Sequence, residues 1–150
     1  MRVVIQRVSQ ASVIVDEKKV ASINKGILVL LGIEIEDTKE DVVWLANKIV
    51  QLRIFQDEKG VMNKSITDVD GGIIVVSQFT LHAKTKKGNR PSYIKAARPE
   101  QAIPLYEQFK KDLSEAIGSQ IQSGEFGADM KISLINDGPV TIIIDTKNKE

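Results

Sequence analysis

The sequence contains no cysteine and only one histidine among its 150 residues. Without cysteine, the protein has no disulfide framework, no thiolate metal ligand and no cysteine nucleophile. Zinc usually needs several His or Cys ligands, and His82 is the one imidazole that a Ser-His-Asp relay could use. We therefore expect neither a metal nor another cofactor.

The chain also lacks an excess of charge of either sign and a long apolar run. Its 21 Lys and Arg against 20 Asp and Glu give a net charge of +1, so attraction to a nucleic acid or a membrane has to be local. The longest apolar stretch, residues 27–33, contains Gly32 and suits a buried strand rather than a membrane span. Arg2 and Arg7 interrupt the apolar N-terminal segment, unlike a secretory signal. We expect a cytoplasmic protein without a membrane partner.

The length and the composition, 42% hydrophobic and 27% charged, suit one globular domain over residues 1–150, since no repeat or composition break divides the chain. Apolar spacing of three to four residues predicts a helix from Thr38 to about Leu52 and a second over 99–117, with Pro104 delaying or kinking the second one. Short strands are expected over 3–8, 11–15, 20–23, 26–33, 73–77, 130–134 and 140–144. We expect residues 145–150 to fray.

These elements predict an α+β fold with a mostly antiparallel, barrel-like sheet and two helices packed on it.

The clearest local charge signal lies between Gly71 and Pro99, where the chain has no acidic residue. The same segment carries six basic residues: Lys84, Lys86, Lys87, Arg90, Lys95 and Arg98. Gly88 and Pro91 indicate a loop, and a basic loop near Tyr93 fits a phosphate backbone. An ordinary solvated loop explains the pattern equally well.

Polar groups follow directly after the expected strand 73–77, in the segment SQFTL (77–81). The hydroxyls of Ser77 and Thr80 and the amide of Gln78 offer hydrogen-bond donors and acceptors without charge. A polar strand end that satisfies nearby backbone groups accounts for these residues as well. No acidic residue near His82 in the sequence would orient it toward either hydroxyl, so the residues alone do not favour a catalytic triad.

Two further segments contain residues with special backbone properties, NDGPVT (136–141) and FGADM (126–130). Local rules predict that the first is a turn with a trans Gly138-Pro139 bond, since only about 5% of X-Pro bonds in folded proteins are cis. The small residues of the second permit a close backbone approach, and they are equally compatible with ordinary core packing. Taken alone, the residues predict an uncharged polar site beside a basic loop, without a defined reaction.

SQFTL together with NDGPVT resembles the paired motifs of D-aminoacyl-tRNA deacylases of the bacterial and eukaryotic type. Further matching segments are RVVIQRVSQASV, GILVLLGI, WLANKIVQLRIF, GVMNKSI, KGNRPSY and FGADM, in the expected order. The resemblance therefore extends over nearly the whole chain. It implies a hydrolase that cleaves the ester between a D-amino acid and the terminal adenosine of tRNA, with glycyl-tRNA as a further substrate.

The resemblance also implies a homodimer in which Gly138 and Pro139, joined by a cis peptide bond, reach into the active site of the other subunit. There, their carbonyl oxygens would accept hydrogen bonds from the substrate ammonium and block the space of an L side chain. The terminal ribose 2′-hydroxyl would assist hydrolysis, while backbone N–H groups around Phe79 and Thr80 stabilise developing charge. This mechanism requires no metal and no protein base.

The resemblance assigns Ser77, Gln78, Phe79 and Thr80 to the part of the site that holds the aminoacyl ester and adenosine. Three residues are placed in the surrounding pocket: Phe126, Ala128 and Met130. From charge alone, we assign four basic residues to the tRNA acceptor end: Lys84, Lys86, Lys87 and Arg90.

Two alternatives stay open at this point. In the first, Thr80 is a nucleophile that forms an acyl-enzyme, although no base accompanies it in the sequence. In the second, the protein is a non-catalytic module that binds tRNA or single-stranded RNA on a β surface. That reading explains the basic loop but not GPVT, and an aromatic content of 5% disfavours a stacking platform.

Overall fold

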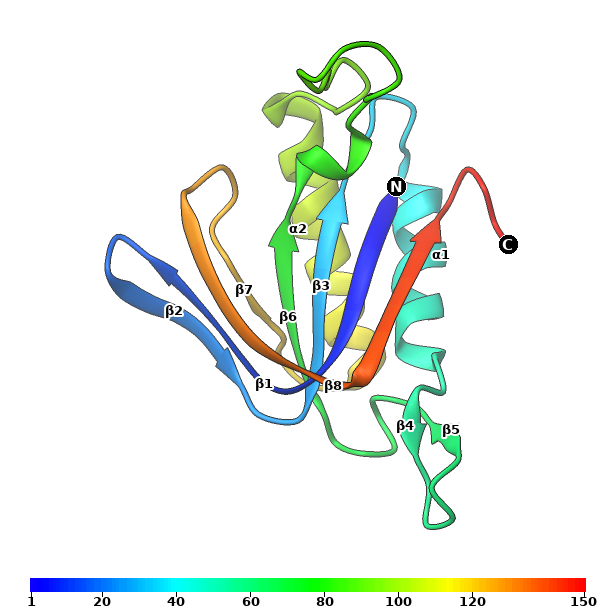
Figure 1. The fold of residues 1–150 in the computed structure, drawn as a ribbon. Coiled ribbons are helices and arrows are strands. Elements are labelled where there is room, and N and C mark those ends of the chain that lie inside the picture. Colours follow the sequence, from blue (N-terminus) through cyan, green and yellow to red (C-terminus); the bar gives the residue numbers. More distant parts are fainter.

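A curved six-stranded sheet with two helices against one of its faces forms the body of the protein (Figure 1). The computed structural model describes all residues, 1–150. The first half of the chain contains β1 (Arg2–Val15), β2 (Lys18–Ile23), β3 (Gly26–Gly32), α1 (Lys39–Gln51), β4 (Phe55–Gln56) and β5 (Met62–Lys64). The second half contains β6 (Gly72–Ser77), the 3₁₀ turn η1 (Phe79–His82), α2 (Pro99–Ile117), β7 (Gln122–Ser123) and β8 (Met130–Asp145).

The strands follow the order β2-β1-β3-β6-β7, and β8 pairs with β1. β1 is antiparallel to β2, β3 and β8, and β4 and β5 form a separate antiparallel pair. The predicted α+β class and the mostly antiparallel, barrel-like sheet are confirmed. The sequence did not predict the two parallel pairings, β3 with β6 and β6 with β7. The first of them arises because α1 crosses back over the sheet between its two strands.

β1 and β8 are long strands that pass from one hydrophobic core to the other. Val3 and Ile5 of β1 pack with the helices, whereas Val13 and Val15 pack in a second core on the curled part of the sheet. The register of β1 with β8 shifts between Gln6 and Gln10, which changes the phase of inward-facing side chains. The prediction of separate strands over 3–8 and 11–15 is therefore wrong, as is the separation of 130–134 from 140–144.

The first core joins the sheet to α1 and α2, and its largest fully buried side chains include Tyr106, Phe55 and Phe109. The predicted bounds of both helices are confirmed. In the first turn of α1, Asp41 accepts a hydrogen bond from the N–H of Thr38 at 2.9 Å. α2 begins at Pro99 and runs through Pro104, so a delayed start is wrong. Pro104 is exposed and removes a single backbone bond, while the buried stripe of α2 holds the helix in place.

The C-terminal segment is attached to α1, which contradicts the predicted fraying of 145–150. Lys147 donates hydrogen bonds to the Asp41 carboxylate at 2.9 Å and to the Glu36 carbonyl at 3.1 Å. The Lys149 ammonium lies 4.3 Å from the centre of the Trp44 ring, within cation–π range. These contacts were not visible in the sequence because they join residues about a hundred positions apart. None of the helices is both long and apolar enough to cross a membrane.

Candidate active site

A cavity of about 250 Å³ lies at the carboxyl end of β6. It brings together six of the residues that the sequence analysis singled out, from segments fifty positions apart: Ser77, Gln78, Phe79, Phe126, Ala128 and Met130. The remaining lining residues were not predicted, and most are apolar: Leu31, Ile33, Val76, Ala97, Ala102, Gly127, Asp129 and Ile132. An apolar cavity with a few polar groups at one end is typical of a small-ligand site.

The backbone at the polar end offers two free hydrogen-bond donors. The buried strand β6 ends at Ser77, and the N–H of Gln78 still bonds to the sheet through the Leu31 carbonyl at 2.7 Å. The chain then turns into η1, where the first N–H groups of a helical turn have no partner within the turn. Accordingly, the N–H groups of Phe79 and Thr80 donate to no acceptor in the protein. They can stabilise an oxyanion placed beside them.

Thr80 is hydrogen-bonded, but not to a base. The Gln78 side-chain amide donates to Thr80 Oγ1 at 2.5 Å. His82 is buried, and its Nε2 has no hydrogen-bond partner. The structure therefore contains no hydrogen bond from His82 to Ser77 or Thr80, and the Ser/Thr-His relay that the sequence disfavoured is not assembled. No group of three or more His, Asp or Glu side chains is arranged to hold a metal ion.

Tyr106 of α2 contacts the wall of the cavity from the helix side of the sheet. Its hydroxyl donates to the Val75 carbonyl at 3.2 Å, and its ring meets Phe126 edge to face with 5.6 Å between centroids. Burial raises the pKa of Tyr106 to about 12. The phenol consequently stays protonated at neutral pH, and it fixes Phe126 rather than exchanging protons.

Gly138 and Pro139 form a bulge on β8. Between the cross-strand pairs Gln6–Thr141 and Val8–Asn136, β1 contributes one residue and β8 contributes four. The two central residues of these four, Gly138 and Pro139, are exposed. Their peptide bond is cis, so the trans turn expected from base rates is wrong, and the cis bond implied by the family resemblance is present.

Arg7 holds this bulge from inside the protein. Arg7 is 5% exposed, and its guanidinium donates to the Asp137 carbonyl at 3.1 Å and to the Ile54 carbonyl at 2.6 Å. The sequence analysis assigned no role to Arg7. A signal for one was present, because Arg7 follows Val3 and Ile5 at the inward-facing positions of β1, where an unpartnered cation is costly.

The bulge does not reach the cavity of its own chain. Strand register places Gly138 beside Arg7 of β1, then Ile27 of β3, then Ile73 of β6, four residues before Ser77. Gly138 and Ser77 are therefore offset by four residues along the strands and by three strand spacings across the sheet. Combined at right angles, these offsets correspond to a separation of about 20 Å. Within one chain, neither Gly138 nor Pro139 lines the cavity that contains Ser77.

The basic loop lies at the top of Figure 1, above the carboxyl ends of β3 and β6. Backbone hydrogen bonds between Lys84 and Ser92 close it, at 2.8 and 3.0 Å. All four predicted tRNA-binding residues, Lys84, Lys86, Lys87 and Arg90, are exposed, and neither they nor Lys95 and Arg98 form an ion pair. Tyr93 of this loop meets Phe79 edge to face, with 5.0 Å between ring centroids.

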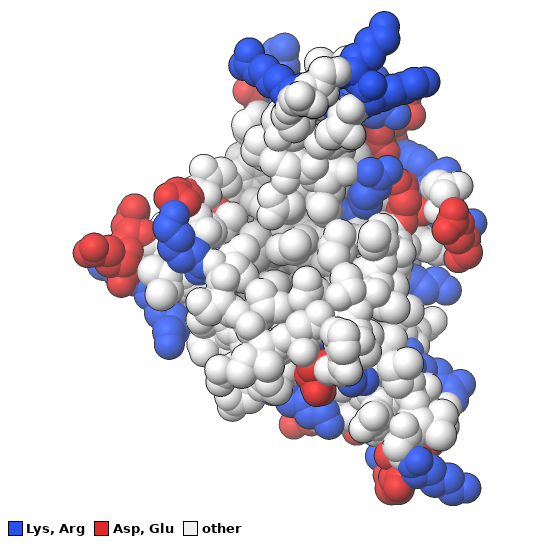
Figure 2. Space-filling view, in the orientation of Figure 1, with Lys and Arg blue, Asp and Glu red and all other residues white.

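The sheet face opposite the helices is uncharged at its centre. Figure 2 shows this face, with Lys, Arg, Asp and Glu gathered mainly around its rim. One row of cross-strand neighbours on this face is apolar and consists of Leu30, Val4 and Ile143. Ile143 is 68% exposed. Such a patch is typical of a protein interface.

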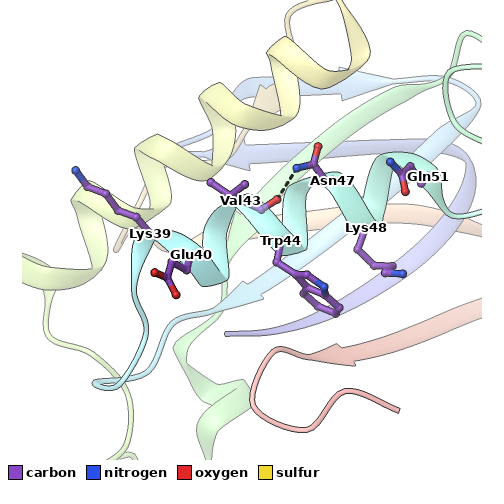
Figure 3. A pocket seen from close by; sticks show the side chains of 7 residues that line it. All are labelled: Lys39, Glu40, Val43, Trp44, Asn47, Lys48 and Gln51. Carbon is purple, nitrogen blue, oxygen red and sulfur yellow. Dashed lines mark hydrogen bonds between the residues drawn. The ribbon is translucent and has the colours of Figure 1, made fainter.

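A second hollow, of about 580 Å³, lies on α1 (Figure 3). Seven residues of this one helix line it, including Val43 and Trp44, and Asn47 bonds only back to the Val43 carbonyl at 2.9 Å. None of the predicted site residues lies there. The hollow is a shallow helix surface, in contrast to the cavity at β6, where several strands and loops converge.

Comparison with known chains identifies the class of protein. The family model described as D-Tyr-tRNA(Tyr) deacylase matches residues 4–145. The chain belongs to the D-aminoacyl-tRNA deacylase family and is an enzyme of the hydrolase class. Curated relatives named D-aminoacyl-tRNA deacylase, from Bacteroides fragilis and Flavobacterium johnsoniae, are 68% and 67% identical over 100% of both chains.

Two solved structures resemble the fold. The c-Myc DNA Unwinding Element Binding Protein is 42% identical, with a TM-score of 0.92 over 97% of this chain and 99% of that one. A probable eukaryotic D-amino acid tRNA deacylase, 19% identical, superposes with a TM-score of 0.81 over 95% and 97% of the two chains. The second likeness concerns the fold alone.

Proposed function

We propose that this protein hydrolyses the ester of D-aminoacyl-tRNA in the cavity at β6, where Ser77, Gln78, Phe79 and Thr80 hold the ester and the terminal adenosine. The observation that carries this proposal is the pair of free N–H groups of Phe79, which lines the cavity, and of Thr80, which follows it in η1. Water adds to the ester carbonyl carbon, and the two N–H groups stabilise the resulting oxyanion. The bond to the ribose 3′-oxygen then breaks, which yields free tRNA and the D-amino acid.

The terminal ribose supplies the group that the protein lacks. Neither Thr80 nor Ser77 is hydrogen-bonded to a base. In the proposed mechanism, the ribose 2′-hydroxyl assists proton transfer while the protein orients the ester and stabilises charge. Phe126, Ala128 and Met130 complete the apolar part of the pocket.

The chiral gate, Gly138 and Pro139, acts across a homodimer in this proposal. Its supports are the separation of about 20 Å from the cavity of the same chain and the exposure of both residues on the bulge. The uncharged sheet face with Leu30, Val4 and Ile143 gives a second copy a surface to pack on. In the proposed dimer, a two-fold axis through this face relates the two gates and the two cavities, so that each gate can serve the cavity of the other subunit.

In this proposal, the enzyme selects D-aminoacyl-tRNA by excluding the L enantiomer from the site. The carbonyl oxygens of the gate accept hydrogen bonds from the substrate ammonium and occupy the space that an L side chain needs. Glycyl-tRNA passes the same test because glycine has no side chain, so we propose it as a second substrate. These properties correspond to proofreading of chirality during translation, and we place the activity in the cytoplasm, together with translation.

Mixed dimers test this proposal. Gly138→Val removes the gate of one chain, and Ala128→Phe fills the cavity of the other. If the gate acts across the interface, the mixed dimer contains one intact site and recovers about half of the wild-type deacylation, although each variant alone is inactive. If the gate acts within its own chain, the mixed dimer has no intact site and stays inactive.

Two alternatives make different predictions. A Thr80 nucleophile requires a covalent acyl-enzyme, so Thr80→Ala abolishes turnover and mass spectrometry of the wild type detects the adduct. In our proposal, Thr80→Ala retains most activity, and no adduct forms. A module that only binds nucleic acid is favoured by the unpaired basic loop, and one relative is named for DNA binding. Catalytic turnover of D-aminoacyl-tRNA excludes it.

A further inference from the structure

We propose that Tyr93, in contact with Phe79, is a stacking surface for the unpaired base of the nucleotide that precedes the terminal adenosine of the tRNA. The proposal rests on the proposed function and deepens it, because it names the part of the tRNA that the protein holds outside the cavity. The occupant is a single-stranded RNA base rather than the paired acceptor stem.

The two rings present unused aromatic surface to solvent. Phe79 is 56% exposed and Tyr93 is 37% exposed. Their planes are inclined by 76°, so one ring directs its edge at the face of the other. In this arrangement the contact between the two rings covers only one face of one ring, so it leaves room for a further π-system to stack. The Tyr93 hydroxyl bonds to no protein group, so the side chain is not tied to a structural partner, in contrast to Tyr106.

The position of Tyr93 fits a strand that leaves the cavity. Phe79 lines the cavity that we assign to the terminal adenosine, and Tyr93 touches Phe79 from the loop side. Beyond Tyr93, the loop carries Lys84, Lys86, Lys87 and Arg90, all exposed and without ion pairs. A strand that passes from the cavity over Tyr93 meets these cations with its phosphates.

Chemistry favours RNA over protein as the occupant of this surface. Aromatic rings alternating with unpaired cations are the usual means of holding single-stranded nucleic acid, since every base has a π-face and every nucleotide a phosphate. From Gly71 to Pro99, no acidic residue opposes such a strand. The open sheet face proposed for the second subunit is, by contrast, uncharged at its centre (Figure 2).

Short substrates separate this role from the chemistry. We would measure kcat/KM for D-tyrosyl-adenosine, and for D-tyrosyl ester on the 3′ end of the dinucleotide CpA, with the full-length protein. The ratio of the two values reports the contribution of the added nucleotide. Tyr93→Ala lowers this ratio about tenfold, the size expected for loss of one base-stacking contact. Tyr93→Phe keeps the ratio, because the ring remains.

Val43→Ala is the matched control, since Val43 is a half-exposed apolar residue on α1, outside the site (Figure 3). It leaves the ratio unchanged. A ratio in Tyr93→Ala equal to that of the parent protein overturns the proposal, as does an equal fall in Tyr93→Phe. A change of molecular mass in solution on Tyr93→Ala also overturns it, because the ring would then contact a second copy. If the wild type cleaves neither substrate nor D-tyrosyl-tRNA, the proposed function itself is wrong.

Discussion

The guanidinium of Arg7 donates a hydrogen bond to the carbonyl of Asp137 at 3.1 Å, directly before the exposed Gly138-Pro139 bulge. The same side chain donates to the Ile54 carbonyl at 2.6 Å. Arg7 thus links the bulge on β8 to the segment that follows α1. Its fork geometry allows both bonds at once, which a lysine ammonium on a flexible stem does not reproduce.

We expect Arg7→Lys to destabilise the protein and misplace the gate. Loss of a buried bond to one or both carbonyls lowers the free energy of unfolding by about 2–3 kcal/mol. We expect kcat/KM for D-tyrosyl-tRNA to fall about tenfold or more. Denaturant unfolding and deacylation assays measure both effects. Arg53→Lys is the control, because Arg53 is exposed and also donates to a backbone carbonyl, that of Asn63. Wild-type activity in Arg7→Lys would contradict the positioning role.

Gly138 occupies a position where a side chain cannot fit. Its φ of +129° is unfavourable for other residues, and a Cβ there would lie 2.8 Å from Arg7 Nη2. We expect Gly138→Ala to displace the bulge and to reduce kcat/KM for D-tyrosyl-tRNA at least tenfold. Gly60→Ala is the matched control, since Gly60 also has a positive φ, +78°, with no atom near the added Cβ. It costs about 1 kcal/mol of stability, as expected for a side chain in a left-handed conformation, and leaves activity unchanged. Equal activities of the two variants would disprove a role for the bulge.

These two positions show what the sequence could predict. The helix stripe of Val42, Leu45 and Ile49 and the runs of β-branched residues predicted most elements, because burial on one face follows directly from spacing. The bulge of Gly138 and Pro139 was not predictable from local rules. The bulge forms because β8 has more residues than β1 between two of their cross-strand pairs. The positions of these pairs depend on packing in the two hydrophobic cores, whose residues come from distant parts of the sequence. Parallel pairing of β3 with β6 was missed for the same reason.

The site was predicted only in part. The polar end of β6 was visible as SQFTL after a buried strand, but its meeting with Phe126, Ala128 and Met130 in one cavity came from the family resemblance, since no local rule joins segments fifty residues apart. The free N–H groups of Phe79 and Thr80 required coordinates. The roles assigned to these residues and to the basic loop stay predictions.

The basic loop offers a test by salt dependence. We expect Lys86→Ala/Lys87→Ala to weaken tRNA binding and to reduce the slope of log K against log salt by about 1.4–1.8, if each lysine neutralises one phosphate. Lys18→Ala/Lys19→Ala removes two adjacent exposed lysines outside the basic loop, at the β1–β2 hairpin, and serves as the control. Binding isotherms measured between about 50 mM and 200 mM salt give the slopes. An unchanged slope in the first variant would refute the assignment.

The attachment of the C-terminal segment predicts acid sensitivity. Burial raises the pKa of the Asp41 carboxyl, but hydrogen bonds from Thr146 and Lys147 outweigh it and hold that pKa well below its ordinary value of 3.8. The folded state therefore binds fewer protons than the unfolded state. The stabilisation is fully present above pH 3.8 and is lost as the pH falls below it.

We expect Asp41→Asn to lower the free energy of unfolding at pH 7 by about 1 kcal/mol, because the pair is only partly shielded from water. Between about pH 4 and pH 2, this variant loses less additional stability than the wild type. Glu107→Gln removes an exposed carboxylate on α2 that pairs with Lys110 and changes stability by at most about 0.5 kcal/mol. Parallel pH profiles for wild type and Asp41→Asn would contradict the assignment.

We propose that this protein removes D-amino acids from tRNA with a hydroxyl supplied by the substrate. The most direct test follows ester loss from D-tyrosyl-tRNA, from L-tyrosyl-tRNA and from D-tyrosyl-tRNA charged at the 3′ position but lacking the terminal 2′-hydroxyl. We predict rapid cleavage of the D-ester, no cleavage of the L-ester and loss of cleavage in the 2′-deoxy substrate. Equal cleavage of the two enantiomers, or unchanged cleavage of the deoxy substrate, would contradict the account and return the chemistry to a protein group such as Thr80.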